Sequence, residues 1–147
     1  GIKKGFPVIA IQSGNVGVVG KVVTAGLDTS LVMPVYDTKC NISARVQNTR
    51  DIGIVSGNGS YGSPLNLQYI RKRVFDSLNH GDIVVTSGEN GNYVKDIPIG
   101  RISKIKILDY DSSLSIELEP VIDFLRLENV LVVDQKNLND KPPLAKN

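Results

Sequence analysis

The chain has 147 residues, a length that fits one ordinary domain or two very small ones. Hydrophobic residues make up 41% and charged residues 22%, which is the balance of a folded chain rather than a disordered one. The formal net charge of +2 comes from 17 basic and 15 acidic side chains that are spread along the sequence. This charge is too small and too dispersed to indicate a nucleic-acid partner, and we interpret the cluster at 71–73 as a solvated turn.

The single cysteine, Cys40, cannot form a disulfide within the chain, so it gives no information about the redox compartment. We interpret it as a small half-buried filler rather than a nucleophile. No apolar run approaches the roughly 18–20 residues that span a bilayer, and no signal peptide is visible. Because the chain opens at Gly1 without a methionine, we expect a fragment of a longer protein.

Short strand patterns and frequent turn formers alternate along almost the whole chain. The predicted strands, in chain order, are 7–13, 16–25, 30–36, 41–46, 53–56, 65–70, 82–87, 97–99, 104–107, 114–118 and 128–134. Turn formers separate them, as at Gly14-Asn15, Asn58-Gly59-Ser60 and Asn79-His80-Gly81. We predict one or two helical turns at 121–127 and a flexible polar tail at 135–147. This pattern predicts an all-β fold, a sandwich or a barrel.

Two strands carry patterns with particular meaning. In the strand 16–25, valines occupy both phases, so both of its faces need cover, and Gly17 and Gly20 mark positions where it bends. In the region 97–107, Ile102 falls out of the alternation set by its neighbours. A bulge or bend at Gly100 explains that slip.

Two glycine-rich segments resemble nucleotide-binding loops only superficially. The spacing of Gly14, Gly17 and Gly20 is G-x-x-G-x-x-G, and β-branched residues follow where a dinucleotide-binding fingerprint needs a helix. The segment 58–64 lacks the lysine and the following helix of a phosphate loop. We interpret the first as a bent strand and the second as a surface loop.

Catalytic and metal-binding constellations are not recognisable in the sequence. The single histidine, His80, and Ser87 stand at the two ends of one predicted strand, about 20 Å apart at roughly 3.3 Å per residue, too far for a nucleophile and its base. We interpret His80 as a turn residue. Cys40 and His80 form no ligand cluster, and the acidic residues lack calcium-loop spacing.

Five segments, in order, resemble the bacterial rod-shape-determining MreC family. The segments are 14–23, 29–32, 46–57, the run 81–88 with 97–102, and 120–133. The resemblance covers about residues 6–134. It marks a set of structural motif residues: Gly14, Gly17, Gly20, Gly81, Asp82, Thr86, Ser87, Gly88 and Gly100. From the residues themselves, Asp82, Thr86 and Ser87 are expected to bond the backbone near turns.

The resemblance implies a fold of two small packed β-barrels, distantly like the double barrel of chymotrypsin-type proteases. We expect a discontinuous first barrel of residues 6–45 plus 97–134 and a second barrel of residues 46–96. A consecutive division near residue 75 is the alternative. The loop 89–95 is polar where the family often has an apolar or proline-containing turn, so a partner contact through it is in question.

The resemblance also implies a non-enzymatic scaffold of cell-wall elongation, without cofactors. The implied partners are a penicillin-binding transpeptidase, MreD and, indirectly, MreB, with self-association into dimers or filaments. The implied location is the extracytoplasmic face of the membrane, where an upstream transmembrane helix would tether the chain. Two alternatives remain open: a double-barrel serine hydrolase, active or degenerate, and a small-ligand-binding β module. The absence of tryptophan and an aromatic content of 5% weigh against sugar binding.

Overall fold

The computed structural model describes residues 2–89 and 94–134, and the regular secondary structure of these residues is almost entirely β-strand. The strands are β1 (Pro7–Gln12), β2 (Asn15–Ala25), β3 (Ser30–Pro34), β4 (Asn41–Val46), β5 (Ile52–Ser56), β6 (Leu65–Gln68), β7 (Ile83–Thr86), β8 (Pro98–Lys106), β9 (Ser115–Pro120) and β10 (Leu131–Val132). Two short 3-10 helices are described, η1 (Lys72–Ser77) and η3 (Phe124–Arg126). The all-β prediction is confirmed, and η3 lies within the predicted helical turns at 121–127.

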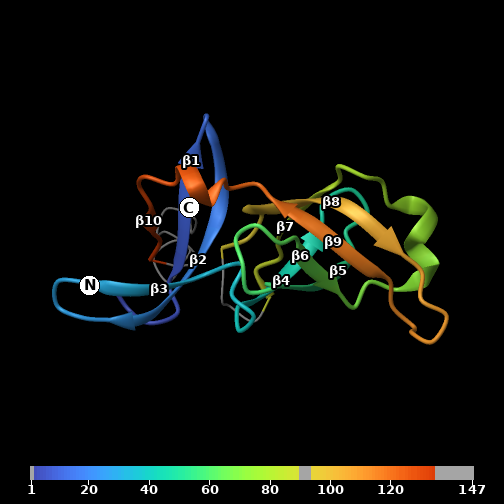
Figure 1. The fold of residues 1–147 in the computed structure, drawn as a ribbon, viewed down its shortest axis with the longest axis horizontal. Coiled ribbons are helices and arrows are strands. Elements are labelled where there is room, and N and C mark those ends of the chain that lie inside the picture. The colour runs from blue at the N-terminus through green and yellow to red at the C-terminus, as the bar shows by residue number, and fades with distance from the viewer. Residues whose placement is uncertain (1, 90–93, 135–147) are drawn as a thin grey trace, which may run out of the picture.

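The strands form two units that lie beside each other (Figure 1). The first is a four-stranded sheet in the order β10-β1-β2-β3, drawn mostly in blue with a red strand at its edge. The second is a closed barrel in the order β4-β5-β6-β9-β8-β7. All the pairings are antiparallel, and β10 joins the first sheet because the chain returns from the barrel after β9.

The strand pairing differs from the predicted division of the chain. The prediction grouped residues 97–134 with the N-terminal strands, whereas β8 and β9 pair with β7 and β6 inside the closed barrel. β4 also belongs to this barrel, and in the described residues the N-terminal unit is an open sheet. The pairing follows side-chain packing: Ile116 and Leu118 of β9 lie opposite Leu67 and Leu65 of β6, and all four are buried.

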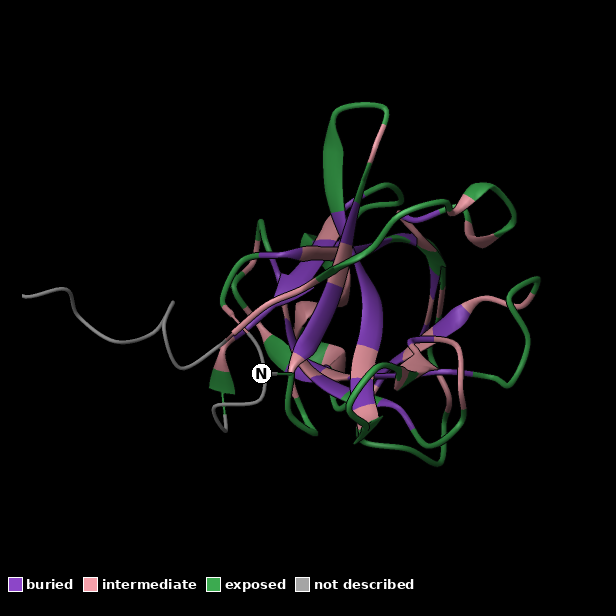
Figure 2. Cartoon of the chain, turned by 90° about the vertical axis from the view of Figure 1, so that its left-hand side faces the viewer, coloured by how far each residue is buried: buried purple, intermediate pink, exposed green. Residues whose placement is uncertain are grey.

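Strand β2 contributes to two hydrophobic cores. Val18 belongs to the cluster that fills the barrel, whereas Val19 and Val22 belong to a smaller cluster with Val8, Ala10 and Ile122. Buried valines therefore occur on both faces of this strand, whereas Val16 at its start is exposed. Figure 2 shows the buried residues concentrated along the strands, while the hairpin tips are exposed. Phe124 is partly buried and packs against both clusters.

The predicted irregularity in β8 is present, and it consists of two register shifts. Opposite β7, Val84 pairs with Gly100 and Val85 with Pro98, which leaves Ile99 as an extra residue. Opposite β9, a second shift lies between Ile102 and Lys104. Because of the bulge at Ile99, Ile99 and Ile102 are both buried although strict alternation would place them on opposite faces.

One described element was not predicted. The basic cluster at 71–73 was interpreted as a solvated turn, but it leads into η1, and Arg71 forms a bridge with Ser113. A six-residue 3-10 helix has no hydrophobic period long enough to be recognised in a sequence. The predicted tail at 135–147 lies outside the described residues.

Candidate interaction surface

The sheet and the barrel border a groove of about 700 Å³, which we call the inter-sheet groove. The turn between β1 and β2 lines one side, and the barrel strands β7, β8 and the end of β9 line the other. The lining residues are Gly14, Asn15, Val16, Gly81, Ile83, Pro98, Arg101, Ile102, Ser103, Glu119, Pro120 and Val121. The groove thus combines apolar residues with one positive and one negative side chain, as protein interaction surfaces do.

The β1–β2 hairpin presents its side of the groove through a two-residue turn. Gln12 pairs with Asn15, and the two residues between them, Ser13 and Gly14, have φ of 50° and 80°. Two positive φ values are what a type I′ hairpin turn requires, and this turn type matches the twist of the flanking strands. Gly14 therefore has a conformational role, and it holds Val16 at the groove.

Gly81 forms the opposite wall, at the turn before β7. Its φ is 90°, its N–H donates to the carbonyl of Ile102 at 2.7 Å, and its own carbonyl accepts from Nη1 of Arg101 at 3.2 Å. The Arg101 side chain is therefore held along the rim of the groove. Two motif glycines that are far apart in sequence, Gly14 and Gly81, line the same groove.

Three further motif glycines allow close packing. A Cβ at Gly17 would lie 2.6 Å from Cγ2 of Val121, and one at Gly100 would lie 2.6 Å from the carbonyl oxygen of Glu119. A Cβ at Gly20 would overlap the backbone of Met33. These distances are shorter than van der Waals contact, so any side chain at these positions would displace neighbouring groups.

The polar motif residue Asp82 binds the backbone at the start of β7. Its Oδ2 accepts from the N–H of Asn79 at 2.9 Å, and its Oδ1 accepts from Nδ2 of Asn48 at 2.9 Å. Its side chain therefore ties the 79–82 turn to the β4–β5 turn. Asp82 is 7% exposed, so these bonds replace those that water would otherwise provide.

Thr86 and Ser87 occupy the other end of β7 and are also buried. The Thr86 hydroxyl accepts from the N–H of Ile97 at 2.9 Å and donates to the carbonyl of Val94. Ser87 Oγ accepts from the N–H of Glu89 at 3.2 Å. Gly88 follows with φ of 75° and lies against the Lys95 side chain. The loop whose partner contact was in question lies partly outside the described residues, at 90–93.

The structure brings no histidine base to Ser87. His80 is exposed and precedes β7, whereas Ser87 is buried after that strand and bonds the local backbone. Cys40 is fully buried, not half-buried as expected, and burial raises the pKa of its thiol to about 11. In the described residues, no group of three or more His, Cys, Asp or Glu side chains could hold a metal ion.

Several lining residues of the groove were not identified from the sequence as site residues: Val16, Ile83, Pro98, Arg101, Glu119, Pro120 and Val121. Ile11 was not identified from the sequence either. It pairs with Val16 across the β1–β2 hairpin and is 62% exposed. A strand pattern marks Ile11 and Val16 as core residues, but both are exposed because they lie near the tip of the β1–β2 hairpin. Within residues 2–89 and 94–134, no helix is long and apolar enough to cross a membrane.

Comparison with known proteins identifies relatives along nearly the whole chain. The family described as rod shape-determining protein MreC, barrel core, matches residues 1–134. The cell shape-determining protein MreC of Listeria monocytogenes is 31% identical over 121 residues, which is 80% of this chain and 40% of the relative. That of Escherichia coli is 26% identical over 145 residues, which is 99% of this chain and 38% of the relative. The chain thus spans less than half the length of these two relatives.

Solved structures agree in fold. MreC from Listeria monocytogenes superimposes with a TM-score of 0.76 at 30% identity, covering 88% of this chain and 60% of that one. MreC from Pseudomonas aeruginosa gives 0.79 at 23% identity, covering 90% and 81%. A complex between penicillin-binding protein PBP2 and MreC from Helicobacter pylori gives 0.57 at 20% identity, covering 77% and 65%. The match over residues 1–134 shows that this chain belongs to the MreC family of non-enzymatic cell-shape proteins, as its barrel core.

Proposed function

We propose that this chain is the scaffold domain through which its full-length protein joins the cell-wall elongation machinery. The observation that carries the proposal is the family match over residues 1–134. The partner class is a penicillin-binding transpeptidase, because a family member of the same fold is known in complex with PBP2. The proposal extends that partnership to this chain.

The geometry suits a scaffold because it presents a fixed surface. A closed barrel has no free strand edges, and β2 locks the N-terminal sheet to it through the two cores that it shares. The inter-sheet groove lies where the two units meet. Its partly exposed apolar residues, with Arg101 and Glu119 beside them, offer both contact area and charge pairing to a partner.

The further partners and the location belong to the same proposal. We place the domain outside the cytoplasmic membrane, tethered by a segment upstream of residue 1. There it would contact MreD, link indirectly to MreB and associate with further copies of itself. Family membership supports this part of the proposal.

A binding measurement with the transpeptidase of the same organism tests the proposal. The chain is immobilised and the affinity is measured for the native sequence, Val16→Asp, Arg101→Glu and the control Ile52→Asp. Ile52 is 50% exposed on β5 and does not line the groove, so its variant controls for an added surface charge. We expect the two groove variants to weaken binding by more than about tenfold and the control to leave it unchanged. No binding by the folded native chain would contradict the proposed function.

A further inference from the structure

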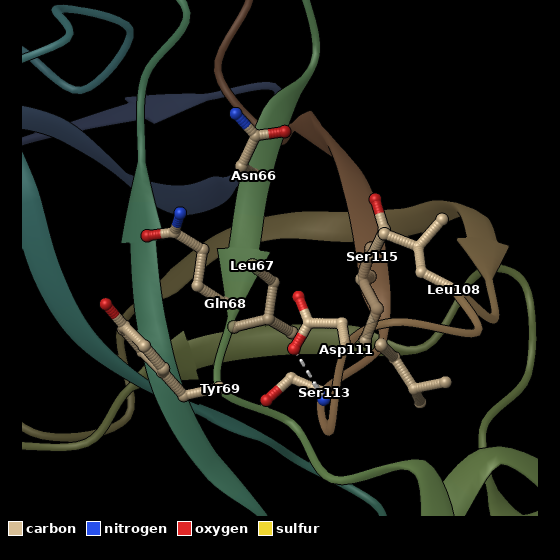
Figure 3. A pocket seen from close by; sticks show the side chains of 10 residues that line it. Asn66, Leu67, Gln68, Tyr69, Leu108, Asp111, Ser113 and Ser115 are labelled. Carbon is tan, nitrogen blue, oxygen red and sulfur yellow. Dashed lines mark hydrogen bonds between the residues drawn. The ribbon is translucent and has the colours of Figure 1, made fainter.

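Strand β3 lies at one edge of the four-stranded sheet, and β10 lies at the other. In the closed barrel every strand has a neighbour on each side, as Figure 3 shows for β6 and β9, which carry the labelled Leu67 and Ser115. β10 has two residues, whereas β3 has five. Within the described residues, β3 is therefore the longer of two open edges, and an open edge presents backbone groups that can pair with another strand.

Alternate residues of β3 point their backbone groups away from β2. The N–H of Val35 donates to a carbonyl of β2 at 2.8 Å, and the carbonyl of Thr29 accepts from the turn after β2 at 2.8 Å, so odd-numbered residues bond toward β2. Because the two directions alternate along a strand, the N–H and carbonyl groups of Ser30 and Val32 point outward. Pro34 is the next outward residue, but its nitrogen carries no hydrogen.

The side chains along this edge are uncharged and partly apolar. Residues 29–36 contain no acidic or basic residue, so the edge lacks the charges by which edge strands usually avoid pairing. Val32 and Met33 are half-buried and pack against the two hydrophobic clusters. Leu31, between the two outward residues, is 62% exposed. An exposed apolar side chain thus lies at the centre of an uncharged open edge.

These features fit a second copy of the same strand. Around a two-fold axis at Leu31, Ser30 of one copy lies opposite Val32 of the other, and every outward N–H and carbonyl of these two residues finds a partner. The two Leu31 residues then form a non-hydrogen-bonded pair, with Cα atoms about 4.5 Å apart, and their side chains cover each other. An axis at Val32 would instead place Ser30 opposite Pro34, which cannot return a hydrogen bond.

The arrangement of the two units leaves room for this pairing. In Figure 1 the barrel lies beyond the C-terminal end of β3, along the long axis of the molecule. A two-fold axis at Leu31 reverses the strand direction, so it places the second barrel beyond the opposite end of the strand pair. The two barrels therefore do not compete for the same space.

We propose that two copies of this chain pair through β3, antiparallel and in register at Leu31, and form a dimer with one sheet continuous across both copies. The inference rests on the self-association included in the proposed function, and it names the surface. Because both copies use the same edge, the assembly closes at two chains, and the two-residue β10 is too short for comparable further pairing.

The size of the contact sets its strength. One short strand pair buries far less than the roughly 1,200 Å² of stable complexes, so we expect a Kd on the order of 0.1–1 mM for the free chain. Tethering two copies to one membrane, as the proposed function requires, would raise their effective concentration to about that range. The dimer is therefore weak in dilute solution and favoured where copies are held together.

Sedimentation equilibrium at up to about 1 mM chain tests the dimer. Leu31→Lys sets two ammonium groups against each other, and Ser30→Pro removes an outward N–H at the first residue of the strand, where proline is tolerated. Leu125 is 74% exposed on η3, so Leu125→Lys controls for the added charge. Circular dichroism checks that each variant is folded.

We expect both edge variants to raise the Kd by at least about tenfold and the Leu125→Lys control to leave it within about twofold. A native chain that stays monomeric, a native chain that forms oligomers larger than two, or a Leu31→Lys variant that dimerises like the native chain would each overturn the proposal. Because no β3 residue lines the inter-sheet groove, transpeptidase binding is measured independently, and the failure of one leaves the other standing.

A cysteine cross-link tests the register of the pair. In Leu31→Cys, the two Cα atoms of a dimer lie about 4.5 Å apart, which is within the range of a disulfide. Leu131→Cys is the matched control, because Leu131 is 53% exposed on β10 at the opposite edge of the sheet. Cys40 is fully buried and does not compete. Under mild oxidation Leu31→Cys should form covalent dimers at least about tenfold faster than Leu131→Cys, and equal rates would refute pairing through β3.

Discussion

The side-chain amide of Gln12 forms two hydrogen bonds with the backbone of Asp123. Its Nε2 donates to the carbonyl oxygen at 2.9 Å, and its Oε1 accepts from the N–H at 2.8 Å. A side chain of β1 thus takes the place of a neighbouring strand and fixes the β1–β2 hairpin to the segment that follows β9. The hairpin tip lines the inter-sheet groove, so this pair contributes to the shape of the candidate interaction surface.

We predict that Gln12→Ala lowers the free energy of unfolding by about 1–2 kcal/mol, because two partly exposed hydrogen bonds are lost. Gln12→Glu keeps the acceptor but loses the donor, and it should cost part of that amount. The measurement is urea denaturation followed by circular dichroism. Asn15→Ala is the control, since Asn15 makes one long bond of 3.4 Å at the same hairpin. A Gln12→Ala variant as stable as the Asn15→Ala control would contradict this prediction.

Two glycines pack so closely against neighbouring backbone that we predict a loss of stability when either gains a side chain. Gly20→Val and Gly100→Val should each lower the free energy of unfolding by more than about 1 kcal/mol, because the added Cβ meets the backbone of a neighbouring strand. Gly62 provides the comparison, since a Cβ there would meet only the Ser60 hydroxyl, at 3.8 Å. Gly62→Val should stay within about 0.5 kcal/mol of the native chain. Melting temperatures of all three variants check the prediction, and an unchanged value for Gly20→Val would refute it.

The buried hydroxyl of Thr86 is expected to stabilise the fold through its hydrogen bonds rather than through its volume. Thr86→Val keeps the shape but leaves the N–H of Ile97 and the carbonyl of Val94 without this partner. We expect a loss of about 1–3 kcal/mol in chemical denaturation. Thr24→Val on the exposed end of β2 is the matched substitution and should be close to neutral. If both threonine variants are equally stable, the Thr86 bonds do not stabilise the fold.

Because the Cys40 thiol is buried, we predict that the stability of the native chain and that of Cys40→Ala depend differently on pH. Burial raises its pKa in the folded chain to about 11 from an ordinary value of 9.0, so the folded state holds the proton more tightly. The stability that this provides is complete below pH 9 and is lost as the pH rises toward 11. The free energy of unfolding of the native chain should therefore fall more steeply over this window than that of Cys40→Ala. Parallel slopes for the two proteins would contradict the prediction, as would rapid thiol labelling of the folded chain at pH 8.

Much of the fold follows from local patterns in the sequence. The alternation of Leu114–Leu118, the valines on both phases of 16–25 and the turn formers between strands are each local, and each predicted strand that they mark is present. The irregularity near Gly100 was detectable because two bulges break a strict period of two. Backbone bonding by Asp82, Thr86 and Ser87 also follows from their positions beside turns.

What the sequence by itself determined was the strand content, the irregularity near Gly100 and, through ordered motifs, the family. The tertiary structure alone decided which strands share a barrel, because pairing between β6 and β9 depends on contacts between residues about fifty positions apart. It also decided that Gly14 and Gly81 border one groove and that β3 lies at the edge of its sheet. A local period specifies which face of a strand is buried, whereas only the packing of distant strands specifies which surfaces remain open.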